Sequence, residues 1–390
     1  MDRTTTAFAK VIGLWAAGMG AAAQFGKVSV AYTYLAEIYG NTGAALGFAV
    51  SLVGSVGIVF GVVAGLVVAR TGFRRALIWA LLLGAVLSGV QALLPPLWLF
   101  LVSRAAEGAS HLAIVVAAPT LIAQISAERH RGLTLSLWST FFGVAFSLLV
   151  WLGLPLLRTH GVPALFAAHG VYMAAMAGLI LILLPRDVVG PQPGTLSPRA
   201  ILAEHVEIYR SPYLSAAGLG WVFYAGSYVA ILTIMPPFVP EAIRAATFAA
   251  FPLVGIASSM TLGVWLLRRV PAVRVVRAGF VAALLASVAI VALPGAGWPY
   301  LLLSAVLGLV QGASFTAIPQ LNAGARGQAQ ANGAMAQMGN VGTTFGTPVL
   351  AALVLGLGLT GFLIFAATLF AGGALVHTVT AARRARVVKA

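Results

Sequence analysis

Three ionisable residues stand close together in an otherwise apolar stretch of the sequence. The segment RAAEGASHLAIVVAAP, residues 104–119, carries Arg104, Glu107 and His111. Spacings of three and four residues place them on one face of a helix. Arginine can hold a carboxylate through two parallel hydrogen bonds, and glutamate and histidine can carry protons. This face therefore predicts an anion-binding site, a proton carrier, or both.

Lys27 is the other charged residue that lies within a long apolar run. At 1.5 Å per residue, Arg104 lies about 10 Å and Lys27 about 16 Å from the same end of their two helices. Two cations and one carboxylate at comparable depth predict a net positive site for a small anion, such as an organic carboxylate. Two alternatives stay open. Arg104 and Glu107 could pair only to hold helices together, and Lys27 could extend towards the outer face.

Glu107 and His111 are the candidate proton-coupling residues, because either could take up a proton on one side of a membrane and release it on the other. Arg104, three residues away, opposes protonation of Glu107. His111 could instead be a packed, hydrogen-bonded histidine. The substrate site could be completed by other polar residues in apolar runs, because such groups are costly in lipid without a partner; these are Gln24, Gln311, Tyr224, Tyr228 and Asn340. Packing is an alternative role for the two tyrosines.

The composition predicts an all-α integral membrane protein. Of 390 residues, 61% are hydrophobic and 8% are charged, and the mean hydropathy is +1.00. A soluble protein of this size would need a more charged surface. The chain has no cysteine, its six histidines are scattered, and it lacks a phosphate-binding loop. We therefore expect no metal site, no cofactor and no enzymatic activity.

Twelve apolar runs are long enough to cross a membrane as helices. Their ranges are 8–38, 42–69, 76–94, 97–125, 133–157, 163–184, 214–239, 246–267, 278–294, 299–321, 332–357 and 360–381. If the N-terminus is cytoplasmic, 19 Lys and Arg residues fall in cytoplasmic segments and two in outer loops. This asymmetry predicts two cytoplasmic termini. It also explains the net charge of +15 without a nucleic-acid partner.

The chain divides into two similar halves around a hydrophilic segment. We predict a six-helix bundle over 1–184, a cytoplasmic linker over 185–213 with a short amphipathic helix near 197–209, and a second bundle over 214–390. EGASH at 107–111 has a counterpart in QGASF at 311–315, which gives Gln311 the repeat position of Glu107. Such parallel repeats are typical of secondary transporters.

Twelve spans, the repeat and the central linker resemble the major facilitator superfamily. The family has a motif between spans two and three that resembles residues of this chain, namely Gly65, Arg70, Gly72, Arg74 and Arg75. The sequence departs from the motif at Ala69, which replaces an aspartate. In the family the aspartate of this motif helps to latch the two halves in one conformation. A span-four motif resembles Arg104 and Gly108, with Glu107 in place of glutamine. The span-five antiporter motif is absent.

The resemblance implies two pseudo-symmetric bundles that alternate access to a site lined by spans one, four, seven and ten. Together with the buried charged residues, the resemblance predicts a secondary transporter of a small organic anion. We expect an ion gradient to drive it, with protons as the ion. Proton-driven export of drugs or metabolites is the alternative, and a non-transporting membrane sensor is a third possibility. We expect a monomer in the bacterial inner membrane.

Overall fold

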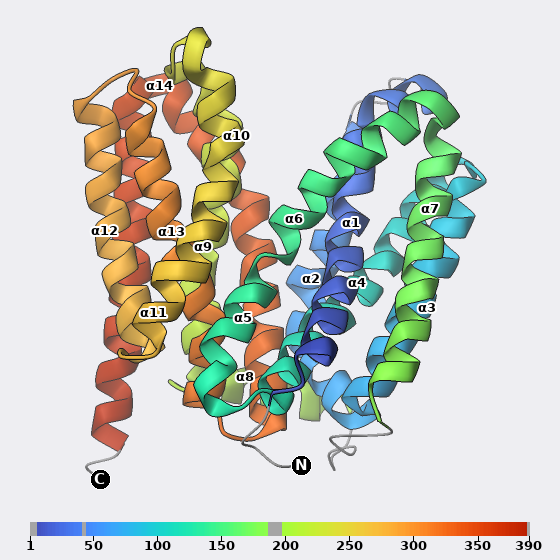
Figure 1. Cartoon of the computed structure of the whole chain (residues 1–390), viewed down its shortest axis with the longest axis horizontal. Coiled ribbons are helices and arrows are strands. Elements are labelled where there is room, and N and C mark those ends of the chain that lie inside the picture. The colour runs from blue at the N-terminus through green and yellow to red at the C-terminus, as the bar shows by residue number, and fades with distance from the viewer. Residues whose placement is uncertain (1–5, 41–43, 186–196, 388–390) are drawn as a thin grey trace. The chain divides into compact units, whose positions relative to one another are not determined.

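The structure is a computed structural model that describes residues 6–40, 44–185 and 197–387 (Figure 1). Within these ranges it contains α-helices, short 3-10 and π segments, and no strand. The α-helices are α1 (Phe8–Tyr39), α2 (Ala44–Thr71), α3 (Phe73–Ala92), α4 (Leu97–Ile125), α5 (Arg131–Ser139), α6 (Phe141–Leu148), α7 (Leu154–Leu183), α8 (Pro198–Arg210), α9 (Ala216–Ile234), α10 (Glu241–Ser258), α11 (Val264–Leu267), α12 (Ala272–Ala292), α13 (Trp298–Leu321) and α14 (Ala325–Val387).

The chain forms two compact units. Unit 1 comprises Met1–Glu128 and Thr140–Ile201, and unit 2 comprises Arg129–Ser139 and Leu202–Ala390. In unit 1, α4 packs against α1, α2 and α3, and α7 packs against α1 and α3 (Figure 1). In unit 2, α14 packs against α9 and α12, and α13 packs against α10, α12 and α5. The predicted bundle boundaries at 184 and 214 stay predictions.

The all-helical membrane fold is confirmed, although the number of helices is not strictly twelve. Nine helices in the described ranges are long and apolar enough to cross a membrane. Two of them, Glu128–Leu183 and Ala325–Arg386, each join two predicted spans without a separate loop. Gly161 and Gly358, with φ of 78° and 58°, lie at these joins. Glycine adopts positive φ without the steric cost of a side chain, so the helix changes direction there.

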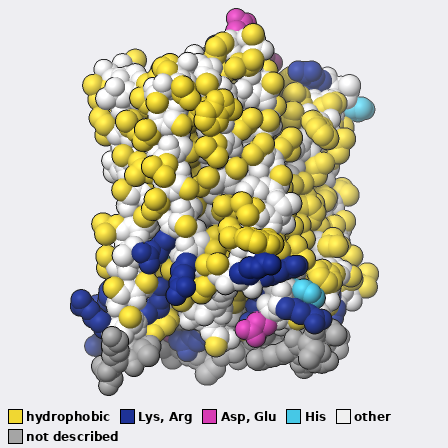
Figure 2. Space-filling view, turned by 60° about the vertical axis from the view of Figure 1, so that its left-hand side comes forward, with side chains coloured by type: hydrophobic (Ala, Val, Ile, Leu, Met, Phe, Trp, Pro, Cys, Tyr) yellow, Lys and Arg dark blue, Asp and Glu magenta, His cyan; other side chains and the backbone are white. Residues whose placement is uncertain are grey.

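Apolar side chains cover much of the surface of the described helices. Ile182, Leu355 and Trp79 are 84%, 91% and 68% exposed, which suits contact with lipid. Figure 2 shows hydrophobic side chains over most of the visible face, with most of the visible Lys and Arg side chains towards one end. This distribution agrees with an apolar zone bordered by a basic one.

The turn between α2 and α3 places Arg74 against the carboxyl end of α7. Gly72 makes this turn with φ of 90°. Arg74 Nε donates to the carbonyl oxygen of Leu184 at 2.8 Å, and its Nη2 donates to that of Leu181 at 3.0 Å. The last carbonyls of a helix have no partner within the helix, and a cation there also complements the helix dipole. Arg74 therefore caps α7.

We expect the substitution Arg74→Ala to lower the free energy of unfolding by about 1–2 kcal/mol, because it leaves two terminal carbonyls without a donor. The exposed Arg158→Ala variant provides the control, with an expected change below about 0.5 kcal/mol. Thermal unfolding of the purified variants in detergent measures both. Equal melting temperatures for the two variants would contradict a capping role.

The predicted amphipathic linker helix is confirmed as α8, which is held against α14 by polar contacts. The Tyr209 hydroxyl donates to Gln337 Oε1 at 2.6 Å. Arg326 Nη2 pairs with Glu204 Oε1 at the same distance. Burial raises the pKa of Tyr209 above its usual value of 10, so the folded protein retains this phenolic proton more firmly than the unfolded chain does.

The contribution of Tyr209 to the stability of the fold is therefore fully present below pH 10 and is lost as pH rises above that value. We expect the Tyr209→Phe variant to lack one late-titrating phenol in the ultraviolet absorbance of the folded protein. Its melting temperature should also fall less steeply with alkaline pH than that of the wild type. If the phenol missing from the variant is instead one that titrates near pH 10, Tyr209 behaves as an ordinary exposed tyrosine.

Candidate substrate site

Lys27 lies on α1 at the centre of a buried polar cluster in unit 1. Its Nζ atom lies 2.6 Å from Glu107 Oε1, 2.7 Å from Ser88 Oγ and 3.2 Å from His169 Nδ1. The Lys27 side chain is fully buried. An ammonium group has three protons to donate, and these three acceptors match them. The alternative in which Lys27 extends to the outer face is therefore wrong.

The Glu107 carboxylate on α4 is the common partner of both buried cations. Its Oε1 atom accepts from Lys27, and its Oε2 atom accepts from Arg104 Nη1 and, at 3.0 Å, from Gln91 Nε2. Arg104 Nε donates to the carbonyl oxygen of Ala49 at 2.7 Å. Arg104 Nη2 is buried and has no hydrogen-bond partner among the described residues. Glu107 therefore holds α1, α3 and α4 together through charged hydrogen bonds.

The surroundings of His169 on α7 determine its tautomer. Its Nε2 atom lies 3.0 Å from the carbonyl oxygen of Gly20, which can only accept, so Nε2 carries the proton. Its Nδ1 atom lies next to Lys27 Nζ, which can only donate, so Nδ1 accepts. Ser88 Oγ lies 2.7 Å from the same Nδ1 atom. His169 is therefore a neutral member of the cluster.

Gln24 lies about one helical turn from Lys27 on α1, and His111 lies about one turn from Glu107 on α4. Gln24 Nε2 donates to Ser110 Oγ at 2.8 Å, and Ser110 donates to the carbonyl oxygen of Ala80. His111 Nδ1 lies 3.0 Å from the carbonyl oxygen of Ala21 and therefore donates to it. This contact agrees with a packed, hydrogen-bonded His111, and its proton-coupling role stays a prediction.

The interlinked cluster carries a surplus of one positive charge, since Lys27 and Arg104 share the single carboxylate of Glu107 and His169 is neutral. The pairing of Arg104 with Glu107 agrees with the structural alternative raised above. It also leaves the anion hypothesis open, because a buried surplus charge is costly unless a counter-charge approaches it. Chemically, such a cluster can bind an anion or exchange its internal carboxylate for one.

The other predicted substrate residues all lie in unit 2, in separate settings. Tyr224 and Tyr228 are stacked, with ring centroids 5.5 Å apart, inside the aromatic core of that unit. Gln311 Nε2 donates to the carbonyl oxygen of Ser139, and Asn340 Nδ2 donates at 2.8 Å to that of Ala336 on its own helix. The structure thus brings the tyrosines together, and the substrate-binding role of all four residues stays a prediction.

Ser88, Gln91 and His169 belong to the cluster but were absent from the sequence-based candidates. Each is a polar residue within an apolar run, which is the signal that could have found them. Their partners lie on other helices, however, and a span without a charged residue gives no indication of its rotation. Among the motif residues, Gly65 is buried on α2 and Arg70 lies in the last turn of that helix. Gly72 and Arg74 belong to the turn described above, and Arg75 follows them.

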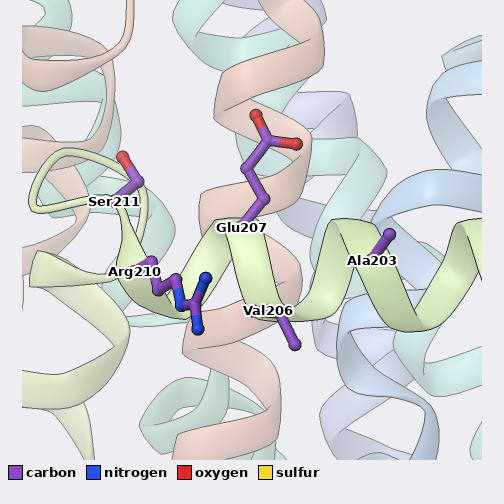
Figure 3. Close-up of a pocket in the computed structure, with 5 residues that line it drawn as sticks. All are labelled: Ala203, Val206, Glu207, Arg210 and Ser211. Carbon is purple, nitrogen blue, oxygen red and sulfur yellow. The ribbon is translucent and has the colours of Figure 1, made fainter.

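A surface pocket of about 410 Å³ lies along α8 and is lined by Ala203, Val206, Glu207, Arg210 and Ser211. Figure 3 shows the polar side chains of Glu207 and Arg210 extending in opposite directions from the helix. The polar groups that line this pocket therefore do not converge on one point, as they do in ligand sites. The buried cluster is the better candidate site.

Comparison with known proteins identifies the fold family. Residues 12–347 match the model of the Major Facilitator Superfamily. The inner membrane transport protein YajR of Escherichia coli (strain K12) is 26% identical over 164 residues, which span 42% of this chain and only 36% of that protein.

Solved structures extend the likeness over nearly the whole chain. The transporter FucP in its outward conformation has a TM-score of 0.73 at 16% identity, with 95% of this chain and 98% of that chain covered. The human organic anion transporter MFSD10 has a TM-score of 0.75 at 17% identity, with 94% and 98% covered. At these identities the likeness concerns the fold.

Proposed function

Because this chain belongs to the Major Facilitator Superfamily, we propose that it is a secondary active transporter of a small organic anion. The observation that carries the proposal is the buried cluster in which Lys27 and Arg104 share one carboxylate, Glu107. Arginine is suited to bidentate carboxylate recognition. A lipophilic cation would be repelled by the surplus positive charge, which argues against the export of cationic drugs.

We further propose that Glu107 couples the anion to protons. In the structure Glu107 pairs with both cations, so it competes with any anionic guest for them. The guest would bind first, while Glu107 is ionised and the cluster carries one surplus positive charge. A proton taken up by Glu107 would then remove its charge and release Lys27 and Arg104 for the carboxylate of the guest. Proton and anion would then be carried together, which is symport driven by an inward proton gradient.

The transport cycle would use alternating access. Two bundles, over 1–184 and 214–390, would rock around the site, with the motif turn from Gly65 to Arg75 limiting their movement. The chain is a multi-pass membrane protein. The bacterial inner membrane, cytoplasmic termini, a monomeric state and the absence of a cofactor or enzymatic activity belong to the proposal.

Flux into liposomes tests this function. We would reconstitute the purified chain, impose an inward proton gradient, and follow labelled lactate, malate and tetraphenylphosphonium. Carboxylate uptake that rises with the gradient and falls at least about tenfold in Arg104→Gln, but not in the exposed Arg158→Gln, is the expected result. Uptake or expulsion of the cation alone would favour drug export. No flux of any solute would favour a non-transporting sensor.

A further inference from the structure

We infer that the guest of this cluster is a hydroxymonocarboxylate: Arg104 Nη2 binds its carboxylate, and Gln91 Oε1 accepts its hydroxyl proton. The inference rests on the proposed function and narrows its substrate class. Three features of unit 1 support it: the charge of the cluster, the two buried polar atoms without partners, and the position of both beside one carboxylate oxygen.

The charge of the cluster favours a single negative charge on the guest. Lys27 and Arg104 are cations, Glu107 is an anion, and the contacts of His169 assign a neutral ring. One surplus positive charge is balanced by a monoanion. A dicarboxylate would leave one buried negative charge, and a zwitterion would bring none to balance the cluster.

The hydrogen-bonding capacity of the cluster favours a hydroxyl group. Ser103 Oγ donates to the carbonyl oxygen of Phe100 at 2.6 Å, so it accepts from Gln91 Nε2 at 3.0 Å. Because Gln91 Nε2 also donates to Glu107, the amide orientation is fixed and Oε1 is the atom without a partner. Arg104 Nη2 likewise has none among the residues that the structure describes. A guest that satisfies both must supply one anionic acceptor and one donor.

Both atoms belong to groups that meet at the same point. Arg104 Nη1 and Gln91 Nε2 donate to the same atom, Glu107 Oε2. Each unpartnered atom is bonded to the same carbon as the nitrogen that donates to Glu107 Oε2, so both lie near that oxygen, where a guest of a few heavy atoms would bind once the site opens. Gln24 Oε1 is also buried without a partner among the described residues, but its amide bonds Ser110 rather than Glu107. Gln328, a buried glutamine on α14 in unit 2, lies outside the cluster and provides a matched control.

Three nearly isosteric probes separate the features of the guest. Lactate carries a carboxylate and a hydroxyl, propionate lacks the hydroxyl, and alanine replaces it with an ammonium group. Malate keeps the hydroxyl and adds a second carboxylate. The melting temperature of the full chain in detergent, measured against the concentration of each probe, gives apparent dissociation constants, because a ligand of the folded state raises stability.

We expect lactate to bind the wild type about tenfold more tightly than propionate, alanine or malate, as one satisfied hydrogen bond to a buried group predicts. In Gln91→Met the preference for lactate over propionate should fall to about one, while Gln328→Met should retain it. Equal binding of lactate and propionate by the wild type, or tighter binding of malate, overturns the inference but leaves an anion transporter. If no carboxylate binds or is transported, the proposed function fails with it. The wild-type ranking decides even where a variant cannot be purified.

Discussion

The Glu107→Gln variant is expected to lose about 3–5 kcal/mol of unfolding free energy, the cost of leaving buried charges without their partner. Lys27 and Arg104 both donate to this carboxylate, and all three side chains are fully buried. Glutamine can accept from one cation but cannot neutralise either. The fall in melting temperature of the purified protein in detergent measures the loss.

The double variant Glu107→Gln with Lys27→Met tests whether the loss comes from charge. Removing one cation together with the anion leaves a cluster of unchanged net charge, so much of the stability should return. Glu207→Gln, on the exposed surface of α8, controls for the change of residue type and should shift stability by less than about 0.5 kcal/mol. A Glu107→Gln protein as stable as wild type would show that Glu107 does not pair with the cations in the folded state.

Charge is the signal that made the centre of this cluster predictable from sequence. A charged residue in an apolar helix needs a partner, and few were available to Lys27 within the spans, so its proximity to Arg104 and Glu107 could be anticipated. The neutral partners in the cluster could not be anticipated in this way. Gln91 and His169 reach the cluster because α3 and α7 are rotated to face α4 and α1, and that rotation depends on packing rather than on local sequence.

Helix breaks show the same limit. One gap between predicted spans, from 157 to 163, contains Gly161. Another, from 357 to 360, contains Gly358, and the helices turn at both glycines. Hydropathy marked these positions because the apolar runs end there. It could not indicate the division of the fifth span into α5 and α6, or the π segment Leu149–Gly153, because these breaks lie within apolar sequence and carry no compositional signal.

Glycines on both helices allow close contact between α9 and α14. A Cβ atom added at Gly346 would overlap the carbonyl oxygen of Gly226 and lie 2.7 Å from its carbonyl carbon. Contacts below 3.0 Å are almost never seen for Cβ atoms. Because the obstacle is backbone, no side-chain rotation relieves it. We expect Gly346→Ala to cost about 3 kcal/mol or more, the upper end for overpacking.

Two other glycines separate this steric effect from the general effect of alanine in a helix. Gly356, on the same helix, would place its Cβ in open space, so Gly356→Ala should be neutral or stabilising by up to about 1 kcal/mol, as helix propensity predicts. In Gly226→Ala the nearest atom is the carbonyl oxygen of Gly342 at 3.3 Å, which a small shift accommodates. Melting temperatures should therefore fall in the order Gly356→Ala, Gly226→Ala, Gly346→Ala. If Gly346→Ala melts at the same temperature as Gly356→Ala, α9 and α14 are not in backbone contact at this position.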